Sequence, residues 1–152
     1  MKEGEKMKID TYTFGSIEIS DEKIITFGDG LPGFEKLRKF TIIEAEGEES
    51  FRYLQSLEDG GICFTIVDPY LLKKDYAPII GEQYFEKLGG GPDSDFAIYS
   101  IACLKEPIEE STLNLAGPIL IHVHNRLGIQ VITEDKMYKT KHKIVDLLKE
   151  RG

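Results

Sequence analysis

Short apolar or alternating runs recur along the first 133 residues of this chain, and glycine, proline or acidic residues separate them. The clearest run is Ile62–Val67, which lies between Gly60-Gly61 and Asp68-Pro69. A run of this length bounded by turn residues predicts a strand, and its nearly continuous apolar character predicts burial on both faces. Many short strands at close spacing favour a closed or nearly closed antiparallel barrel.

The remaining strands follow from the same pattern. We expect strands at residues 9–14, 17–19, 23–27, 40–44, 51–54, 96–104, 118–124 and 128–133. The last two are separated by the turn at residues 125–128, so they should pair. A length of 152 residues suits one domain. The fold class is therefore mainly β: a single small antiparallel β-barrel-like domain over residues 8–152, after a loose N-terminal tail at residues 1–7.

Two helices are expected beside the barrel. The first is a short internal helix over Pro78–Leu88, with proline near its first turn and a glycine run after its end. The second is a C-terminal helix over Lys136–Glu150, with Met137, Ile144 and Leu148 on one face. This second helix either lies across the barrel or forms a mobile arm.

Charge is spread unevenly along the chain. The formal net charge is −8, and residues 1–133 carry 23 acidic against 13 basic residues, a net of −10. An acidic body repels phosphate, so an oligonucleotide-binding barrel is disfavoured, and it attracts a basic protein. No segment is apolar and long enough to span a bilayer or to serve as a signal peptide, so we expect a cytoplasmic protein and no membrane partner.

His122 and His124 raise the question of a metal. Two histidines separated by one residue lie on the same face of a strand, and such a pair is a start for a zinc site. No third ligand is fixed nearby. Because Ile119, Ile121 and Val123 look like the core face, we expect both imidazoles on the outer side. A small-barrel metal-dependent enzyme centred on these histidines is the alternative to a binding module.

Other signatures of enzymes are absent from the sequence. There is no Gly-x-Ser-x-Gly elbow, and the run Gly89-Gly90-Gly91 lacks the lysine of a phosphate loop. Cys63 and Cys103 each lie in an apolar run, which predicts buried, reduced thiols. We therefore expect no enzyme and no cofactor.

A loop after residue 28 has an unusual composition. Gly30, Pro32 and Gly33 frame Leu31 and Phe34. Glycine and proline fix the path of such a loop, so it is able to hold both apolar side chains against the core or against a partner.

This loop also carries a family resemblance. The segment Phe27-Gly28-Asp29-Gly30-Leu31-Pro32-Gly33-Phe34-Glu35 resembles the Phe-x-x-Gly-Leu-Pro-Gly-Phe-Glu signature of the FliW family of flagellar assembly factors. Leu54-Gln55-Ser56, Asp68-Pro69 with Tyr76, the segment around Asn114–Ile119, and Gln130 agree with the family in the same order. Together these matches run from about residue 8 to residue 139. One departure is His122, which stands where the family usually has asparagine.

The resemblance implies a switch between two protein partners. FliW proteins bind CsrA, a basic RNA-binding dimer that represses flagellin mRNA, and they also bind flagellin. Flagellin that accumulates before export occupies FliW and frees CsrA, so flagellin synthesis falls. An acidic body suits the basic partner.

Ten residues are candidates for these contacts. The acidic candidates for CsrA binding are Glu44, Glu46, Glu48, Glu49, Asp68 and Asp75. The candidates for an apolar partner surface are Leu31, Phe34, Gln55 and Tyr76. For the first group the competing interpretation is a solvated turn, and for the second it is core packing.

Overall fold

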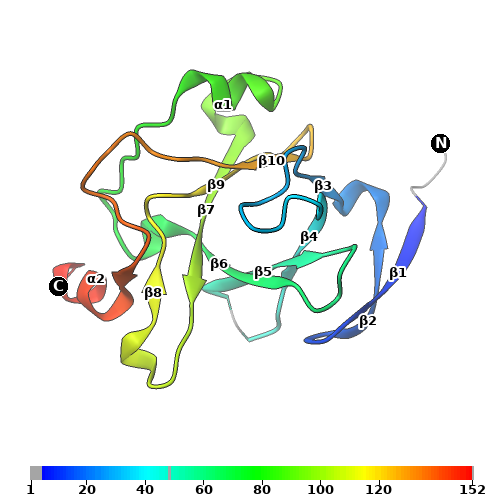
Figure 1. Ribbon diagram of the computed structural model, residues 1–152, viewed down its shortest axis with the longest axis horizontal. Helices are drawn as coiled ribbons and strands as arrows, with labels where there is room; N and C mark the ends of the chain where they lie inside the picture. The colour runs from blue at the N-terminus through cyan, green and yellow to red at the C-terminus, as the bar shows by residue number, and fades with distance from the viewer. Residues whose placement is uncertain (1–4, 48, 152) are drawn as a thin grey trace.

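Seven strands close into a barrel in the computed structural model, which describes residues 5–47 and 49–151 (Figure 1). Around the barrel the strands follow the order β7, β6, β5, β4, β3, β10 and β9, and pairing of β7 with β9 closes the ring. Their bounds are β3 (Ile25–Thr26), β4 (Lys39–Glu44), β5 (Phe51–Ser56), β6 (Cys63–Val67), β7 (Phe96–Cys103), β9 (Ile119–His122) and β10 (Leu127–Gln130). The expected mainly β fold with a barrel is confirmed.

Strand pairing follows the sequence pattern except at one place. The strands from β3 to β7 pair antiparallel with their neighbours in chain order, and β9 pairs antiparallel with β10 as the turn at residues 125–128 predicts. The pair β3–β10, however, is parallel, with Thr26 opposite Leu127. The barrel is therefore not antiparallel throughout, because the β9–β10 hairpin inserts as a unit between β3 and β7.

The main core fills the barrel interior. Phe27, Phe40, Leu54, Ile66 and Ile119 have no exposed side-chain surface and belong to one apolar cluster. Side chains alternate along a strand, so the neighbours of these residues point outward. Those outward side chains need a second layer to cover them.

The C-terminal segment supplies part of that layer. Two short strands, β8 (Thr112–Leu113) and β11 (His142–Lys143), extend the sheet from the end of β7. Helix α2 (Ile144–Arg151) follows, and its Leu147 packs with Ala102 and Tyr138 in a second cluster. The helix therefore packs on the barrel.

The expected helix over residues 136–150 is wrong in its first half. Residues 136–141 are irregular. The periodicity predicted that Met137 and Leu148 face the barrel, but both are exposed, and Leu147 is the buried residue. Tertiary contacts override the helical pattern here: the Tyr138 ring is buried, and its hydroxyl accepts a hydrogen bond from the Ala77 N–H at 2.9 Å.

Helix α1 (Glu82–Lys87) covers another outer face, at the top of Figure 1. It is shorter than the expected helix over residues 78–88, because the Ile79 N–H donates to an Asp135 carboxylate oxygen at 2.6 Å and holds the preceding segment extended. Behind the helix, Leu88, Leu120 and Val131 form a third buried cluster.

A hairpin of β1 (Lys6–Thr11) and β2 (Gly15–Ser20) forms a separate two-stranded sheet beside the barrel. The hairpin joins the turn between β5 and β6, where the Tyr12 N–H donates to the Gly60 carbonyl at 3.1 Å. Strand β1 begins at Lys6, inside the segment 1–7 that the sequence suggested as a tail. Residues 1–4 of that segment lie outside the described residues.

Cysteine burial differs from the expectation. Both thiols are free, but Cys63 is half-buried and Cys103 is exposed. Cys103 is the last residue of β7, next to an exposed connection at residues 104–110, so the apolar run around it does not end in the core. None of the helices in the described part of the chain has the length and apolar character that a membrane crossing needs.

Candidate functional site

A groove of about 850 Å³ lies between the β1–β2 hairpin and the barrel. Its apolar lining consists mainly of isoleucine, and we call it the isoleucine groove. The isoleucines come from both sides: Ile17 and Ile19 from β2, Ile25 from β3, Ile42 and Ile43 from β4, and Ile121 from β9. Seven charged residues of the described chain also line the groove, so it is suited to hold an amphipathic segment of another chain.

A charged network borders the isoleucine groove. The register of β4 and β5 places Glu44 opposite Arg52, whose Nε lies 3.1 Å from a Glu44 carboxylate oxygen. The Arg52 guanidinium also donates to the Tyr99 hydroxyl at 2.9 Å and lies 5.9 Å from the centre of the same ring. The Glu44 side chain is 72% exposed, so it remains accessible to a partner.

Three acidic candidates gather around this network, and we call Glu44, Glu49 and Asp68 the acidic rim. A hollow of about 110 Å³ beside the groove is lined by Glu49, Asp68, Arg52 and Tyr99. Asp68 is exposed and caps the following short helical turn, since its carboxylate accepts the Tyr70 N–H at 2.9 Å. One basic side chain therefore lies among three carboxylates.

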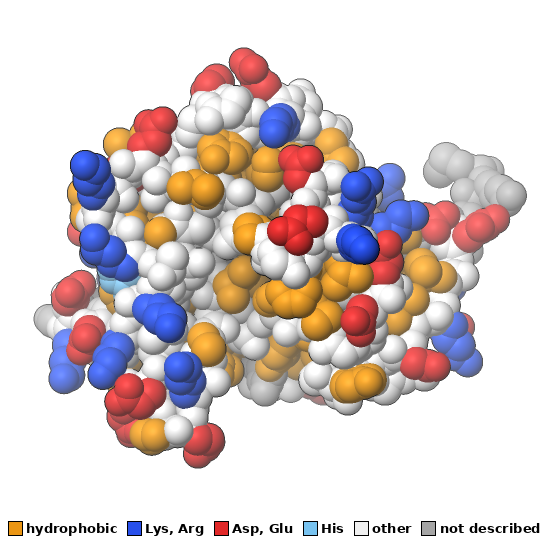
Figure 2. Space-filling model, viewed as in Figure 1, with side chains coloured by type: hydrophobic (Ala, Val, Ile, Leu, Met, Phe, Trp, Pro, Cys, Tyr) orange, Lys and Arg blue, Asp and Glu red, His pale blue; other side chains and the backbone are white. Residues whose placement is uncertain are grey.

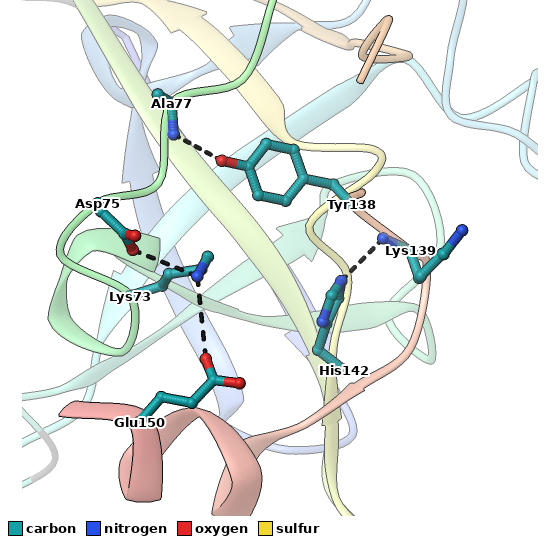
Figure 3. Close-up of polar contacts among 7 residues, drawn as sticks. All are labelled: Lys73, Asp75, Ala77, Tyr138, Lys139, His142 and Glu150. Atoms are coloured by element: carbon teal, nitrogen blue, oxygen red, sulfur yellow. Dashed lines mark hydrogen bonds and ion pairs between the residues drawn. The ribbon is translucent and has the colours of Figure 1, made fainter. Parts of the chain in front are cut away.

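The other acidic candidates are placed differently. Glu46 is exposed in the turn between β4 and β5, and Glu48 lies outside the described residues. Asp75 does not join the acidic rim. Figure 3 shows Lys73 between Asp75 and Glu150 of α2, with its Nζ 3.2 Å from the first carboxylate and 3.9 Å from the second.

Three of the four apolar-surface candidates are buried. Leu31, Gln55 and Tyr76 belong to the interior. The Gln55 amide donates to three backbone carbonyls in and beside the β5–β6 turn, and the Tyr76 hydroxyl donates to the Leu115 carbonyl at 2.7 Å. Burial raises the pKa of Tyr76 above its ordinary value. Leu31 and Gln55 therefore support the surface from beneath and do not line it.

Phe34 is the one of these candidates that reaches the surface. Its half-buried ring packs edge-on against Phe64 at 5.5 Å between ring centres, and Leu31 beneath it belongs to the barrel core. The loop therefore covers one end of the barrel. On the face shown in Figure 2, hydrophobic side chains gather near the centre, beside this loop and over β5 and β6, with charged side chains around them.

The two histidine rings are neighbours, with centres 6.0 Å apart, but they differ in burial. His122 is only 4% exposed: its Nδ1 accepts the Asn125 N–H at 3.1 Å, so its Nε2–H donates to the Gly90 carbonyl at 3.1 Å. Strand β9 ends at His122, so alternation does not continue to His124, which is exposed and lies 3.2 Å from Asp95. His122 does lie on the outer face of the barrel wall, opposite Ile119 and Ile121, but it is not exposed, because Phe96 and the segment after α1 cover its ring.

This geometry does not support the metal interpretation. Both nitrogens of His122 are engaged by the backbone, and no group of three His, Cys, Asp or Glu side chains suited to a metal occurs among residues 5–47 and 49–151. The structure thus gives no support to an enzyme centred on His122 and His124.

Sequence reasoning missed Arg52, Tyr99 and the isoleucine groove. The Glu44–Arg52 pair has a sequence signal. Glu44 is acidic at the end of one predicted strand, and Arg52 is basic near the start of the next, so the two side chains can pair if the strands form a hairpin. No comparable signal marks Tyr99, because its place beside Arg52 depends on strands 47 residues apart in the chain.

Comparisons with known proteins identify relatives over nearly the whole chain. A family model described as FliW protein matches residues 8–144. The flagellar assembly factor FliW of Alkaliphilus metalliredigens is 40% identical over 92% of this chain and 87% of its own, and that of Caldicellulosiruptor bescii is 35% identical over 95% and 94%. A crystal structure of the flagellar assembly factor FliW superposes with a TM-score of 0.85 at 35% identity, covering 91% of this chain and 96% of that one.

Proposed function

Because this chain belongs to the FliW family of flagellar assembly factors, we propose that it serves flagellar assembly by binding two proteins in turn, CsrA and flagellin. Binding of CsrA relieves its repression of flagellin mRNA. Binding of flagellin releases CsrA, which then represses again. The observation that carries this proposal is the position of the acidic rim directly beside the isoleucine groove.

The acidic rim is the proposed contact for CsrA. Glu44, Glu49 and Asp68 are exposed, and they lie on a body whose net charge is −10 over residues 1–133. A basic partner gains association rate and orientation from such a surface. Carboxylates beside the regulator also raise the cost of bringing RNA phosphates close to it.

The isoleucine groove is the proposed contact for flagellin. An amphipathic helix lays its apolar face into a groove of this kind, with side chains one helical turn apart as anchors. Ile17 from the hairpin and Ile42 from the barrel would contact such a helix from two sides.

Glu44 gives a physical reason for mutual exclusion. It lines the isoleucine groove and also belongs to the acidic rim. A helix in the groove would desolvate or displace the Glu44–Arg52 pair and so change the rim that CsrA meets. The two partners are therefore coupled through overlapping surfaces, and by linkage each weakens the other to the same extent. We place this switch in the cytoplasm, and it needs neither catalysis nor a cofactor.

A charge-matched pair of variants tests the CsrA contact. The triple substitution Glu44→Gln, Glu49→Gln, Asp68→Asn removes the acidic rim. The control Glu86→Gln, Glu109→Gln, Glu134→Gln removes three exposed carboxylates elsewhere. Exposed ion pairs contribute about 0.2–1 kcal/mol each, so the rim variant should bind CsrA about 10-fold more weakly, and the control should change little. Equal weakening by both variants would show that net charge alone matters and would refute the rim.

A substitution in the groove tests the flagellin contact separately. Ile17 is half-buried on the hairpin, so Ile17→Ser should leave the barrel folded. We expect flagellin binding to weaken about 10-fold, since a large apolar side chain in a contact contributes about 1.5–3 kcal/mol. CsrA affinity should stay within about twofold. Unchanged flagellin binding measured by calorimetry would remove the groove from the proposal.

A further inference from the structure

A second hollow, of about 570 Å³, lies on the other side of the β7–β9 wall from the isoleucine groove. Side chains alternate along β7, so Ala97 and Tyr99 line the groove while Phe96 and Ile98 line this second hollow. We call it the aromatic pocket. It opens beneath α1 and the segment that follows β6, and it shares none of its lining with the isoleucine groove.

Two aromatic pairs form the walls of the aromatic pocket. On one side Tyr70 and Tyr76 have ring centres 5.8 Å apart, and on the other Phe85 and Phe96 meet edge-on at 5.0 Å. Most of this lining is fixed in place. The Tyr76 hydroxyl is bonded to a backbone carbonyl, and the Phe96 ring packs edge-on against the buried His122 at 4.9 Å. Rigid walls lose little entropy when a ligand enters.

The charge in the aromatic pocket has one sign. Asp93 is the only charged residue in its described lining, and it is exposed. No hydrogen bond or ion pair engages its carboxylate within residues 5–47 and 49–151. The aromatic faces and the Asp93 carboxylate therefore favour a cation.

We propose that the aromatic pocket receives an arginine side chain from a protein partner. The aliphatic stem of arginine packs against Pro78 and Ile98, and its flat guanidinium stacks on the aromatic rings. Two of its N–H groups are then able to donate to the Asp93 carboxylate. A neutral apolar side chain would bury Asp93 without a partner, which costs free energy. A lysine ammonium lacks the flat face and is more strongly hydrated.

The proposal is tested with a small probe on the intact protein. Binding of n-butylguanidinium is followed by two-dimensional amide NMR, with n-butylammonium and the neutral analogue N-butylurea as comparisons. We expect n-butylguanidinium to cause saturable chemical-shift changes at residues around the pocket. n-Butylammonium should bind at least about 3-fold more weakly, and N-butylurea should cause no such changes. Equal binding of N-butylurea would overturn the need for charge, and tighter n-butylammonium binding would overturn the choice of arginine.

Variants locate the probe. Tyr70 is 40% exposed, so Tyr70→Leu keeps an apolar side chain and removes one aromatic face, and Asp93→Asn removes only the charge. Each should weaken n-butylguanidinium about 3- to 30-fold. Glu109→Gln, an exposed carboxylate on a different segment, is the matched control and should leave the affinity unchanged. If Asp93→Asn, a surface change that leaves the fold intact, binds like the control, the pocket is not a guanidinium site.

Discussion

Replacing Gly128 with alanine tests how tightly the barrel interior is packed around Phe27. A Cβ atom at Gly128 would lie 2.5, 2.7 and 3.0 Å from three carbons of the Phe27 ring. Favourable carbon–carbon contacts lie at about 3.5–4.0 Å, so one of the two residues has to move. Phe27 has no exposed surface, and its ring meets Phe40 edge-on at 5.3 Å, so it has no free space to enter.

The expected cost follows from two opposing effects. Overpacking a well-packed core costs about 1–3 kcal/mol, while replacing glycine in a strand returns about 0.5–1 kcal/mol. Gly128→Ala should therefore lower the free energy of unfolding by about 1–2 kcal/mol. Gly28→Ala is the matched control, because a Cβ there meets nothing within 4 Å. It should be neutral or slightly stabilising.

A double-mutant cycle assigns the cost to Phe27. Phe27→Leu alone destabilises the protein by leaving a cavity, but in the double variant that cavity accepts the methyl group that Gly128→Ala introduces. The double variant should therefore be at least about 1 kcal/mol more stable than the sum of the two single effects predicts. Urea unfolding gives each value, with a shifted midpoint and an unchanged slope. Additive single effects, or a Gly128→Ala variant as stable as Gly28→Ala, would refute the packing argument.

Three further outcomes follow from single contacts. Burial and the nearby Lys73 hold the pKa of His142 below its ordinary value. As pH drops from about 7, the histidine of the unfolded chain therefore takes up its proton before that of the folded protein, and the free energy of unfolding should fall until pH passes the folded pKa. His142→Gln should flatten the urea midpoints measured across that range. The Glu58 carboxylate accepts hydrogen bonds from the backbone N–H groups of Arg38 and Lys39 at 2.6 and 2.8 Å, and these bonds lower its pKa. The ionised carboxylate therefore stabilises the fold above about pH 4.3, and this stabilisation is lost as pH falls through the lowered pKa. Glu58→Gln should therefore be less stable at neutral pH and converge with the parent protein in acid. Equimolar zinc should leave the melting temperature unchanged; a rise of several degrees would contradict the backbone engagement of His122.

Local pattern predicted most strands but not the C-terminal segment. The turns around Gly60 and at residues 125–128 fix short-range pairing, so the β5–β6 and β9–β10 pairs were accessible from the sequence. Helical periodicity over residues 136–150 misled because β11 pairs with β8, a partner about 30 residues earlier. Burial of Tyr138 against the barrel then outweighs helix propensity.

The candidate site was predicted in part. Acidic residues close in sequence, such as Glu44 and Glu49, identify an exposed acidic turn. Asp68 is a candidate from the family resemblance, and only the structure shows that it lies beside Glu49. Apolar or polar character alone does not say whether Gln55 or Tyr76 faces solvent. That depends on the hydrogen bonds that each makes to carbonyls brought close by the fold.

The central claim is that one acidic-rimmed groove couples two protein partners. The most direct measurement is the dissociation constant of the CsrA complex, determined by calorimetry at fixed salt with and without saturating flagellin. The coupling through Glu44 predicts an apparent CsrA dissociation constant at least about 10-fold higher in the presence of flagellin, a coupling free energy of about 1.4 kcal/mol or more. An unchanged dissociation constant, with both partners bound at once, would contradict the account.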